Sequence, residues 1–506
     1  MSPLISFDRL RMSGPRGKFA RVRGNIVNKK RIVRELQSIV GKGMVIHHPD
    51  DMLVYEYDGS VDRAMPLAVV FPSSTEQVSR VVSLAHREGM AVVPRGAGTG
   101  LSGGAIAAQG GIQIALTRMR SVLEVDAANR TALVEPGLVN LDLSKAVAKC
   151  GLYYAPDPSS QRACTIGGNV AENAGGPHCL RYGVTTNHVL ALEVVLEDGT
   201  VTWLGDGYRG RPGYDLVGAL VGSEGMMGVV TKALVRLLPL PEAVRTLLAV
   251  FPGMDQACGA VSRIVASGLI PSALEMMDGL TIKAVETAMR FGYPQDAGAI
   301  LLIEVDGLSE EVEEATRRVQ EVCLAEGASE IKTASEAAER ERLWAGRKGA
   351  LGALGVLAPN YFLVDGVVPR SRLMEVLRKV GEVSVESGLP IANVFHAGDG
   401  NLHPCILFDE RQEGQMARVV AAGGEILKAC VAVGGTLTGE HGVGLEKKEY
   451  MPLVFTNADL EAMLRLKRAL APGGLFNPGK VFPGGPSCGE LSQRSAVGRA
   501  GAGGWV

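Results

Sequence analysis

The glycine-rich stretch Pro94-Arg-Gly-Ala-Gly-Thr-Gly-Leu-Ser-Gly-Gly104 decides the fold, because it places five glycines between two apolar segments. Residues 91–94 before it and residues 111–116 after it both have the apolar composition of buried strands. A two-residue turn does not need five glycines, whereas a loop whose backbone N–H groups surround a phosphate can use them. We therefore expect a phosphate-binding loop between two strands, with an ordinary tight turn as the alternative.

The same loop formally matches the dinucleotide-binding fingerprint, with glycines at positions 98, 100 and 103. In a Rossmann domain a helix begins at this loop and its N-terminus binds the pyrophosphate. Here Gly110 and Gly111 interrupt the chain, and the next segment has a strand pattern. This context argues against a Rossmann domain.

A second group of glycines and short polar residues lies between residues 157 and 176. It comprises Asp157-Pro-Ser-Ser160, Thr165-Ile-Gly-Gly-Asn169 and Asn173-Ala-Gly-Gly176. Hydroxyl and amide side chains beside glycines suit a ligand that is rich in hydrogen-bond donors and acceptors. Together with the first loop, they indicate one large phosphate-bearing cofactor that contacts several loops.

The overall composition excludes several classes of protein. The 506 residues contain 52 Lys and Arg against 54 Asp and Glu, and this balance argues against a nucleic-acid groove. The eight cysteines form no Cys-x-x-Cys pair, which argues against an iron–sulfur cluster and a disulfide framework and favours a reducing compartment. No apolar run approaches the roughly 18 residues that span a bilayer. We expect a cytoplasmic protein without a transmembrane segment.

Apolar spacing predicts strands and helices on both sides of Pro239 and Pro241, where we place a domain boundary. The expected helices are 31–40, 75–88, 254–267 and 309–326, and the expected strands include 66–71, 132–135, 190–196, 246–251 and 299–305. The expected organisation is a basic arm or targeting segment (1–40), a cofactor domain (60–240), a second domain (241–433), a glycine-rich return (434–483) and a disordered tail (484–506).

The segment Val394-Phe-His-Ala-Gly-Asp-Gly-Asn-Leu-His-Pro404 suggests a metal site. Asp399-Gly400 is a strong two-residue hairpin turn and has apolar residues on both sides. With that turn, His396 and His403 are cross-strand partners on one face, with Cβ atoms about 5 Å apart. Two imidazoles at this spacing can bind one metal ion, although a hydrogen-bonded core histidine is the more ordinary interpretation of either alone.

Two further segments could complete an active site. In Gly434-Gly-Thr-Leu-Thr-Gly-Glu-His-Gly-Val-Gly444, the acid Glu440 could complete a His₂-carboxylate metal site and His441 could act as a base. A solvated Glu-His pair in a flexible loop is the alternative. Arg347, on an expected helix, could bind a substrate carboxylate through two parallel hydrogen bonds, although a surface arginine is the commoner case.

These motifs, in this order, resemble the FAD-linked 2-hydroxy-acid dehydrogenases of the vanillyl-alcohol-oxidase superfamily, which include glycolate oxidases and D-lactate dehydrogenases. The resemblance covers roughly residues 40–483. It implies an α+β fold with a PCMH-type FAD-binding domain, an α+β cap domain built on an antiparallel sheet, and a C-terminal segment that returns to the flavin.

The resemblance also implies which residues bind FAD. They are Pro94, Arg95, Gly96, Ala97, Gly98, Thr99, Gly100, Leu101, Gly103, Gly104, Pro158, Ser159, Thr165, Ile166, Gly168, Asn169, Asn173, Gly175, Gly176, Gly183, Glu224, Gly225, Gly228, Val229, Val230, Asn477 and Lys480. Relatives that bind flavin covalently carry a histidine in the first glycine loop. None occurs between Pro94 and Gly104, so we expect non-covalent FAD.

By the same likeness, a divalent metal (Zn or Mn) is held by His396, His403 and Glu440 and polarises the substrate hydroxyl. His441 then takes the hydroxyl proton while a hydride passes to flavin N5, and Arg347 holds the carboxylate. Some relatives have polar residues where Leu351 and Phe362 stand here. The expected substrate is therefore a small D-2-hydroxy acid, either glycolate or D-lactate.

The electrons must leave through a partner or a diffusible acceptor, because the chain has no cluster motif. In the family, the precedent is a companion flavin-type subunit and an iron–sulfur subunit at the inner face of the membrane. The sequence is also compatible with a homodimer. Two alternatives stay open. One is a catalytically silent flavin-binding subunit, and the other is a metal-independent flavin oxidase of another alcohol.

Overall fold

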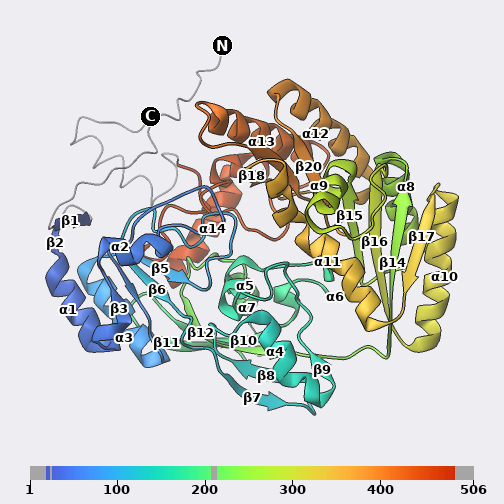
Figure 1. The fold of residues 1–506 in the computed structure, drawn as a ribbon. Coiled ribbons are helices and arrows are strands. Elements are labelled where there is room, and N and C mark those ends of the chain that lie inside the picture. The colour runs from blue at the N-terminus through green and yellow to red at the C-terminus, as the bar shows by residue number, and fades with distance from the viewer. Residues whose placement is uncertain (1–18, 23–24, 207–212, 485–506) are drawn as a thin grey trace.

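The structure is a computed structural model that describes residues 19–22, 25–206 and 213–484. The chain folds into a first domain, a second domain built on one large sheet, and a C-terminal segment that returns to the first domain (Figure 1). Residues 1–18 and 23–24 of the expected basic arm, and residues 485–506 of the expected tail, lie outside the described residues.

The described part of the first domain contains two main sheets, beside the two-stranded pairs β1-β2 and β13-β9. In the smaller one, β4, β6 and β5 are parallel and β3 pairs antiparallel with β4. The larger one has the antiparallel order β11-β10-β12-β8-β7. The strands are β1 (Phe19–Val22), β2 (Asn25–Asn28), β3 (Val45–Ile46), β4 (Ala68–Val70), β5 (Val92–Arg95), β6 (Ile112–Ala115), β7 (Val122–Asp126), β8 (Thr131–Val134), β9 (Leu152–Tyr153), β10 (Val189–Val195), β11 (Val201–Gly205), β12 (Val229–Arg236) and β13 (Leu238–Pro239).

Helices α1 and α3 pack together against the small sheet. The side chain of Ser74 caps α3 by accepting from the Gln77 backbone N–H, and α3 buries the apolar face that the sequence predicts. The helices of this domain are α1 (Lys29–Val40), α2 (Pro49–Met52), α3 (Thr75–Glu88), α4 (Asn140–Val147), α5 (Ile166–Glu172), α6 (Cys179–Tyr182) and α7 (Leu216–Leu220). Helix α1 contains the expected helix 31–40, and its Ile32 and Leu36 lie in the same core as α3, so residues 29–40 belong to the first domain and not to a separate arm.

The second domain is built on one antiparallel sheet of seven strands, ordered β17-β14-β16-β15-β20-β22-β18. Its strands are β14 (Ala243–Phe251), β15 (Ala273–Asp278), β16 (Ala299–Gly307), β17 (Glu330–Ala334), β18 (Asn360–Leu363), β20 (Ile391–Phe395) and β22 (Pro404–Phe408), beside the short pair β19 (Gly366–Val367) and β21 (Asn401–Leu402). The expected strands 246–251 and 299–305 lie within β14 and β16.

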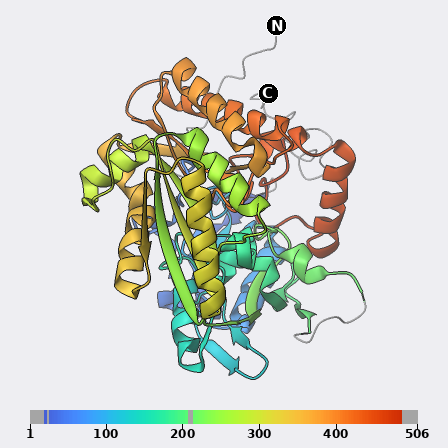
Figure 2. The same ribbon diagram turned by 90° about the vertical axis from the view of Figure 1, so that its right-hand side faces the viewer.

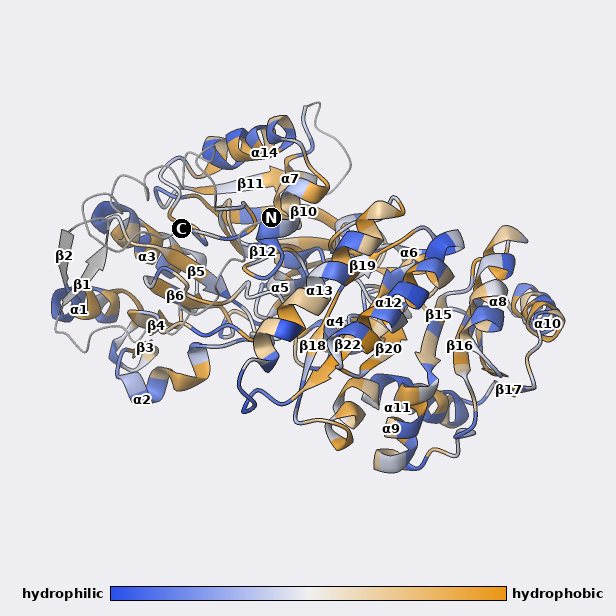
Figure 3. Cartoon of the chain, turned by 90° about the horizontal axis from the view of Figure 1, so that it is seen from above, coloured by the Kyte–Doolittle hydropathy of each residue, from blue (hydrophilic) through white to orange (hydrophobic). Residues whose placement is uncertain are grey.

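Helices cover both faces of this sheet (Figure 3). One apolar core contains side chains of α8, α10, α12 and α13, and the core on the opposite face contains side chains of α9 and α11. Figure 2 shows α10, in yellow, lying against the sheet. The helices are α8 (Met254–Ala266), α9 (Gly279–Met289), α10 (Ser309–Ala325), α11 (Ala337–Ala353), α12 (Leu373–Ser387), α13 (Gln415–Ala432) and α14 (Asn457–Leu470).

After α14 the chain returns to the small sheet of the first domain. Phe476 forms a parallel bridge with Val92, and the Asn477 N–H donates to the Val92 carbonyl over 2.9 Å. This return places residues 477–480 beside the glycine-rich loop that follows β5.

Candidate active site

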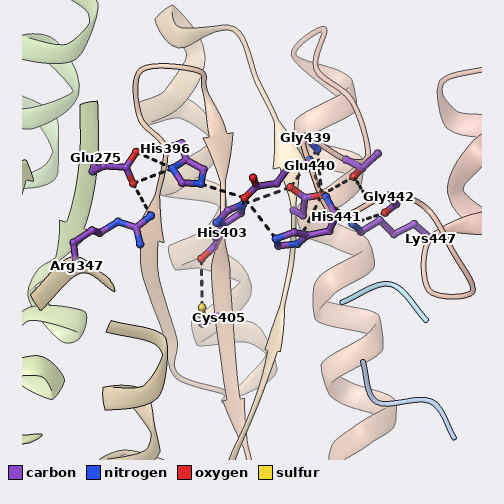
Figure 4. Close-up of polar contacts among 12 residues, drawn as sticks. Glu275, Arg347, His396, His403, Cys405, Gly439, Glu440, His441, Gly442 and Lys447 are labelled. Carbon is purple, nitrogen blue, oxygen red and sulfur yellow. Dashed lines mark hydrogen bonds and ion pairs between the residues drawn. The ribbon is translucent and has the colours of Figure 1, made fainter. Parts of the chain in front are cut away.

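The candidate active site lies where the second domain meets the loop 434–444 (Figure 4). His396 follows β20 and His403 precedes β22, while Glu440 and His441 come from the loop after α13. All four side chains lie mostly out of contact with solvent. The residues that the sequence proposed for metal binding and for the base are therefore brought together.

The expected register of the histidine hairpin is wrong by two residues. Asn401, not His403, lies opposite His396, and the loop comprises residues 397–400 rather than Asp399-Gly400 alone. The reason is a competing interaction, because Val368 donates to the Gly400 carbonyl and β19 pairs with β21. A slip of two residues preserves the face on which a side chain lies. His396 and His403 are therefore diagonal neighbours, with ring centroids 5.1 Å apart.

Glu440 is the centre of the cluster. Its Oε1 lies 3.1 Å from Nε2 of His396, 3.5 Å from Nε2 of His403 and 3.6 Å from Nε2 of His441. The rings of His403 and His441 stack with centroids 4.9 Å apart. One carboxylate oxygen thus faces three imidazoles.

The donor set fits a divalent metal. One ligand atom from each of His396, His403 and Glu440 lies within 4.8 Å of the others, and Asp365, His403 and His441 form an overlapping set. Nε2 of His403 and Nδ1 of His441 are buried and lack a hydrogen-bond partner among the described residues. Buried ring nitrogens are normally satisfied, so these two are consistent with a bound ligand or cation. Two imidazoles and one carboxylate are a common ligand set of catalytic zinc.

Glu275 orients His396 and also binds Arg347. It lies on β15, is 1% exposed, and accepts from Nδ1 of His396 over 2.7 Å. Its other oxygen lies 2.6 Å from Nη2 of Arg347 on α11. A carboxylate on Nδ1 fixes the ring orientation and directs Nε2 toward Glu440. Arg347 is therefore paired behind His396 and is not an exposed arginine, while its buried Nε has no hydrogen-bond partner in the described part of the chain.

The buried charges shift several pKa values. Burial disfavours charge on His396, but Glu275 and Glu440 outweigh burial and raise its pKa to about 10. Burial also opposes ionisation of Glu440, but His396 lowers that pKa to about 2. For His441, burial dominates over the attraction of Asp365 and lowers the pKa to about 4. His441 is thus neutral near pH 7 and able to accept a proton.

Two residues at this site carry no motif that the sequence analysis used. Glu275 lies within the apolar run Ala273–Asp278, and an acid inside a buried strand pattern is a signal that could have revealed it. Asp365 lies between β18 and β19 and is fully buried beside His403 and Lys447. A single acidic residue after a short strand, as Asp365 is, offers no comparable signal in the sequence.

The predicted flavin loops converge. A Cβ atom on Gly96 would lie 2.4 Å from Oγ1 of Thr165, so the first loop touches the start of α5. The side-chain amide of Asn477 donates to the carbonyls of Gly104 and Glu224. Lys480 donates to the carbonyl of Gly104. Residues 96–111, all of them described, contain no helix, as expected for a loop that is not a Rossmann motif.

Other predicted flavin residues have structural roles in their own elements. Gly183 ends α6 with φ +78°, and a Cβ there would meet Asn187. Gly228 packs against Val194, and Val229 lies in the core of the small sheet. Ile166 is buried in the core of the larger sheet. The side chains of Val229 and Ile166 therefore point into apolar cores.

The proposed role of Phe362 is not supported by its position. Phe362 packs on the sheet face covered by α12 and α13, where its ring would contact a Cβ added to Gly423. Its neighbour Leu363 and the partly buried Leu351 belong to the opposite face, with α9 and α11. Because Cβ atoms alternate along a strand, Phe362 points away from the face that carries Leu363.

Comparison with known proteins gives the family. Residues 66–205 match the family described as FAD binding domain, and residues 240–481 match FAD linked oxidases, C-terminal domain. The chain is 46% identical over 466 residues to the glycolate oxidase subunit GlcD of Escherichia coli strain K12, covering 92% of this chain and 93% of that protein. The chain belongs to the FAD-linked oxidases.

Other relatives agree with this assignment. The chain is 41% identical to the glycolate oxidase subunit GlcD of Bacillus subtilis strain 168, over 85% of this chain and 92% of that protein. It is 33% identical to a D-lactate dehydrogenase of Anaerostipes hadrus, over 85% of this chain and 91% of that protein. Like its family, this chain is an FAD-dependent oxidoreductase.

Solved structures confirm the fold class. P-cresol methylhydroxylase superposes with a TM-score of 0.76 at 17% identity, covering 90% of this chain and 97% of that chain. An alkyldihydroxyacetonephosphate synthase superposes with a TM-score of 0.70 at 19% identity, covering 91% and 87%. The expected α+β fold with a PCMH-type FAD-binding domain is correct.

Hydropathy places one limit on membrane contact. Across the described segments, every helix is either too short or too polar to pass through a bilayer.

Proposed function

We propose that this protein oxidises a small D-2-hydroxy acid, glycolate or D-lactate, to the 2-oxo acid, with non-covalent FAD and a divalent cation (Zn or Mn). The observation that carries the proposal is the convergence of His396, His403 and Glu440 on one buried point, with the ring of His441 stacked beside them. The names of the similar proteins, a glycolate oxidase subunit and a D-lactate dehydrogenase, support this substrate class.

His396, His403 and Glu440 would hold the cation, and the loops around Gly98, Thr165 and Asn477 would hold FAD. When bound, the cation supplies Lewis acidity toward a hydroxyl and the flavin supplies a two-electron acceptor. The loops fit FAD because the first glycine loop touches Thr165 at the start of α5, and Asn477 and Lys480 both donate to Gly104 at the end of that loop.

The chain's own residues then perform four tasks. His441, neutral because of burial, accepts the hydroxyl proton at a ring nitrogen. Glu275 holds the ring of His396 so that its Nε2 faces Glu440. Arg347 offers its remaining N–H groups to a substrate carboxylate. Burial of these groups excludes water, which strengthens each charge interaction.

A catalytically silent flavin-binding subunit is the second candidate function. Such a subunit has no need of two histidines, a glutamate and a neutral base at one buried point, so the cluster favours the enzyme. We further propose that electrons leave through companion flavin-type and iron–sulfur subunits, since two relatives are named as oxidase subunits. The proposed location is the cytoplasm, peripheral to the membrane through those partners.

Stopped-flow mixing with a panel of D- and L-2-hydroxy acids tests the proposal through bleaching of the flavin absorbance. We expect rapid bleaching by glycolate or D-lactate and slow bleaching by L-lactate. His441→Gln should slow bleaching about 100-fold or more, the lower end of a general base's contribution. His86→Gln, an exposed histidine in the last turn of α3, is the matched control and should not change the rate. Absence of bleaching by every hydroxy acid would support the silent subunit.

A further inference from the structure

Glu440 and His441 are consecutive residues, yet both side chains reach His403. Oε1 of Glu440 lies 3.5 Å from Nε2 of His403, and the ring of His441 stacks on the same imidazole. In an extended chain, consecutive side chains point to opposite faces. The backbone must therefore bend sharply at residues 439–441, and some group must stabilise this bend.

That group is the carboxylate of Asp365. It accepts hydrogen bonds from the N–H of Gly439 over 3.1 Å and from the N–H of His441 over 3.0 Å. The hydroxyl of Thr438 donates to the same oxygen over 2.5 Å. Successive backbone N–H groups that converge on one anion form a nest, and a nest fixes the local backbone curvature. Asp365 is 0% exposed, so water does not compete for these bonds.

Further hydrogen bonds connect both ends of the bend, Thr438 and Gly442, to Asp365. Nζ of Lys447 lies 3.2 Å from Oδ2 of Asp365 and donates to the carbonyl of Gly442 over 3.0 Å. The Gly442 N–H donates to Oγ1 of Thr438 over 3.0 Å. Lys447 also balances the charge of the buried carboxylate, which would otherwise be costly.

Asp365 also faces the two imidazoles whose ring nitrogens lack partners. Its Oδ1 lies 3.5 Å from Nε2 of His403, and its Oδ2 lies 3.9 Å from Nδ1 of His441. A carboxylate on one side of an imidazole sets the ring orientation. Asp365 is thus connected to the backbone and the side chain of His441.

We propose that Asp365 is the positioning residue of this site. Its carboxylate holds the bend at residues 438–442 so that the side chains of Glu440 and His441 both lie against His403. The proposal rests on the proposed function for its catalytic consequence. Its structural part, the nest around the carboxylate, stands independently.

Asp365→Asn is the direct test, because it preserves shape but replaces one acceptor oxygen with a donor that faces the N–H groups. At saturating metal we expect kcat to fall about 100-fold, the upper end for loss of a supporting carboxylate. Divalent-metal affinity should fall at least 10-fold, while flavin content and the KM for the hydroxy acid change less than threefold. A residue that only stabilised the fold would not separate kcat from KM and flavin content.

Asp278→Asn is the matched control. Asp278 is a partly buried carboxylate at the end of β15, and it caps α9 and accepts from Asn393. This variant should lose stability but keep kcat and metal affinity within threefold of the wild type. If Asp365→Asn behaves like Asp278→Asn, the positioning role is wrong.

Hydrogen exchange gives a readout that does not depend on substrate. The amides of Gly439 and His441 should exchange slowly in the wild-type protein and at least 10-fold faster in Asp365→Asn. Fast exchange of both amides in the wild type would overturn the proposal even if the variant fails to fold. If no 2-hydroxy acid bleaches the wild-type flavin, the proposed function fails, but exchange and metal affinity still decide the role of Asp365.

Discussion

Replacement of Glu275 by glutamine tests the support of the metal site. Glu275 is 1% exposed and holds both Nδ1 of His396 and the buried guanidinium of Arg347. Breaking a buried ion pair by removing one partner costs about 3–5 kcal/mol, because the other charge stays buried without compensation. Glutamine still accepts one hydrogen bond, so we expect a loss of about 3 kcal/mol in the free energy of unfolding.

The same variant should weaken metal binding. Loss of a carboxylate that orients a metal-binding histidine reduces affinity roughly 10- to 100-fold. Guanidinium unfolding of the metal-free protein measures the stability change, and competition with a chromophoric chelator measures the affinity. Glu193→Gln is the matched control, because Glu193 is a buried acid of the first domain that binds Lys232 and Thr231. It should lose stability without a change in metal affinity.

The reasoning would be refuted if Glu275→Gln changed the free energy of unfolding by less than about 0.5 kcal/mol, the range of ordinary surface substitutions. It would also be refuted if metal affinity stayed within twofold of the wild type. Either result would mean that His396 is oriented without Glu275.

Three further predictions concern other parts of the molecule. His403→Ala should reduce metal affinity and the rate of flavin bleaching at least about 10-fold and leave the FAD content unchanged. Metal competition measures the affinity, and absorbance measures bleaching and FAD content. Unchanged metal affinity would remove His403 from the ligand set. Gly98→Ala should lose FAD, because its φ is +74° and the new Cβ would lie 2.2 Å from Arg95, whereas the control Gly110→Ala has φ +68° but no described atom within 4 Å. Equal FAD content in the two glycine variants would contradict the prediction that the contact at Gly98 matters for FAD. The imidazole of His178 contacts Asp157 and Glu304. Burial opposes its charge, but both acids raise the pKa of His178 well above normal. The free energy that charged His178 adds to the folded state is therefore fully present below about pH 6.5 and is lost as the pH rises. His178→Gln should therefore flatten the alkaline loss of stability in unfolding measured against pH, and an unchanged alkaline limb would contradict the prediction.

The elements with clear periodicity were predictable from the sequence. Helix α3 begins and ends at the expected residues because Ser74 caps it and Gly89 ends it in the left-handed region. The expected helix 309–326 ends one residue late, since α10 is Ser309–Ala325. The rejection of a Rossmann helix after the glycine loop was correct, because the strand pattern of β6 outweighed the local motif.

The hairpin register was not predictable from local turn preference. Asp399-Gly400 favours a two-residue turn, but Gly400 bonds to Val368 of another segment, and a Cβ on Gly400 would lie 2.1 Å from the Val368 carbonyl. Tertiary pairing therefore overrides the turn. His396 and His403 still share one face because the error was an even number of residues.

The supporting carboxylates were also hidden from the sequence. Glu275 and Asp365 act through groups that are more than 70 residues away along the chain, namely His396 and the 438–442 bend. Neither has a fixed spacing to its partner, so only the folded chain shows the connection. Arg347 was singled out from the sequence as a group for a substrate carboxylate, but its buried pair with Glu275 had no sequence signal.

The central claim is that a divalent cation bound by His396, His403 and Glu440 assists hydroxy-acid oxidation. Its most direct test is metal analysis of protein purified without chelator, followed by single-turnover flavin bleaching before and after metal removal. We predict one Zn or Mn ion per chain, loss of bleaching by glycolate and D-lactate when the ion is removed, and recovery when it is restored. Bleaching at the full rate by metal-free protein that retains its FAD would contradict the claim.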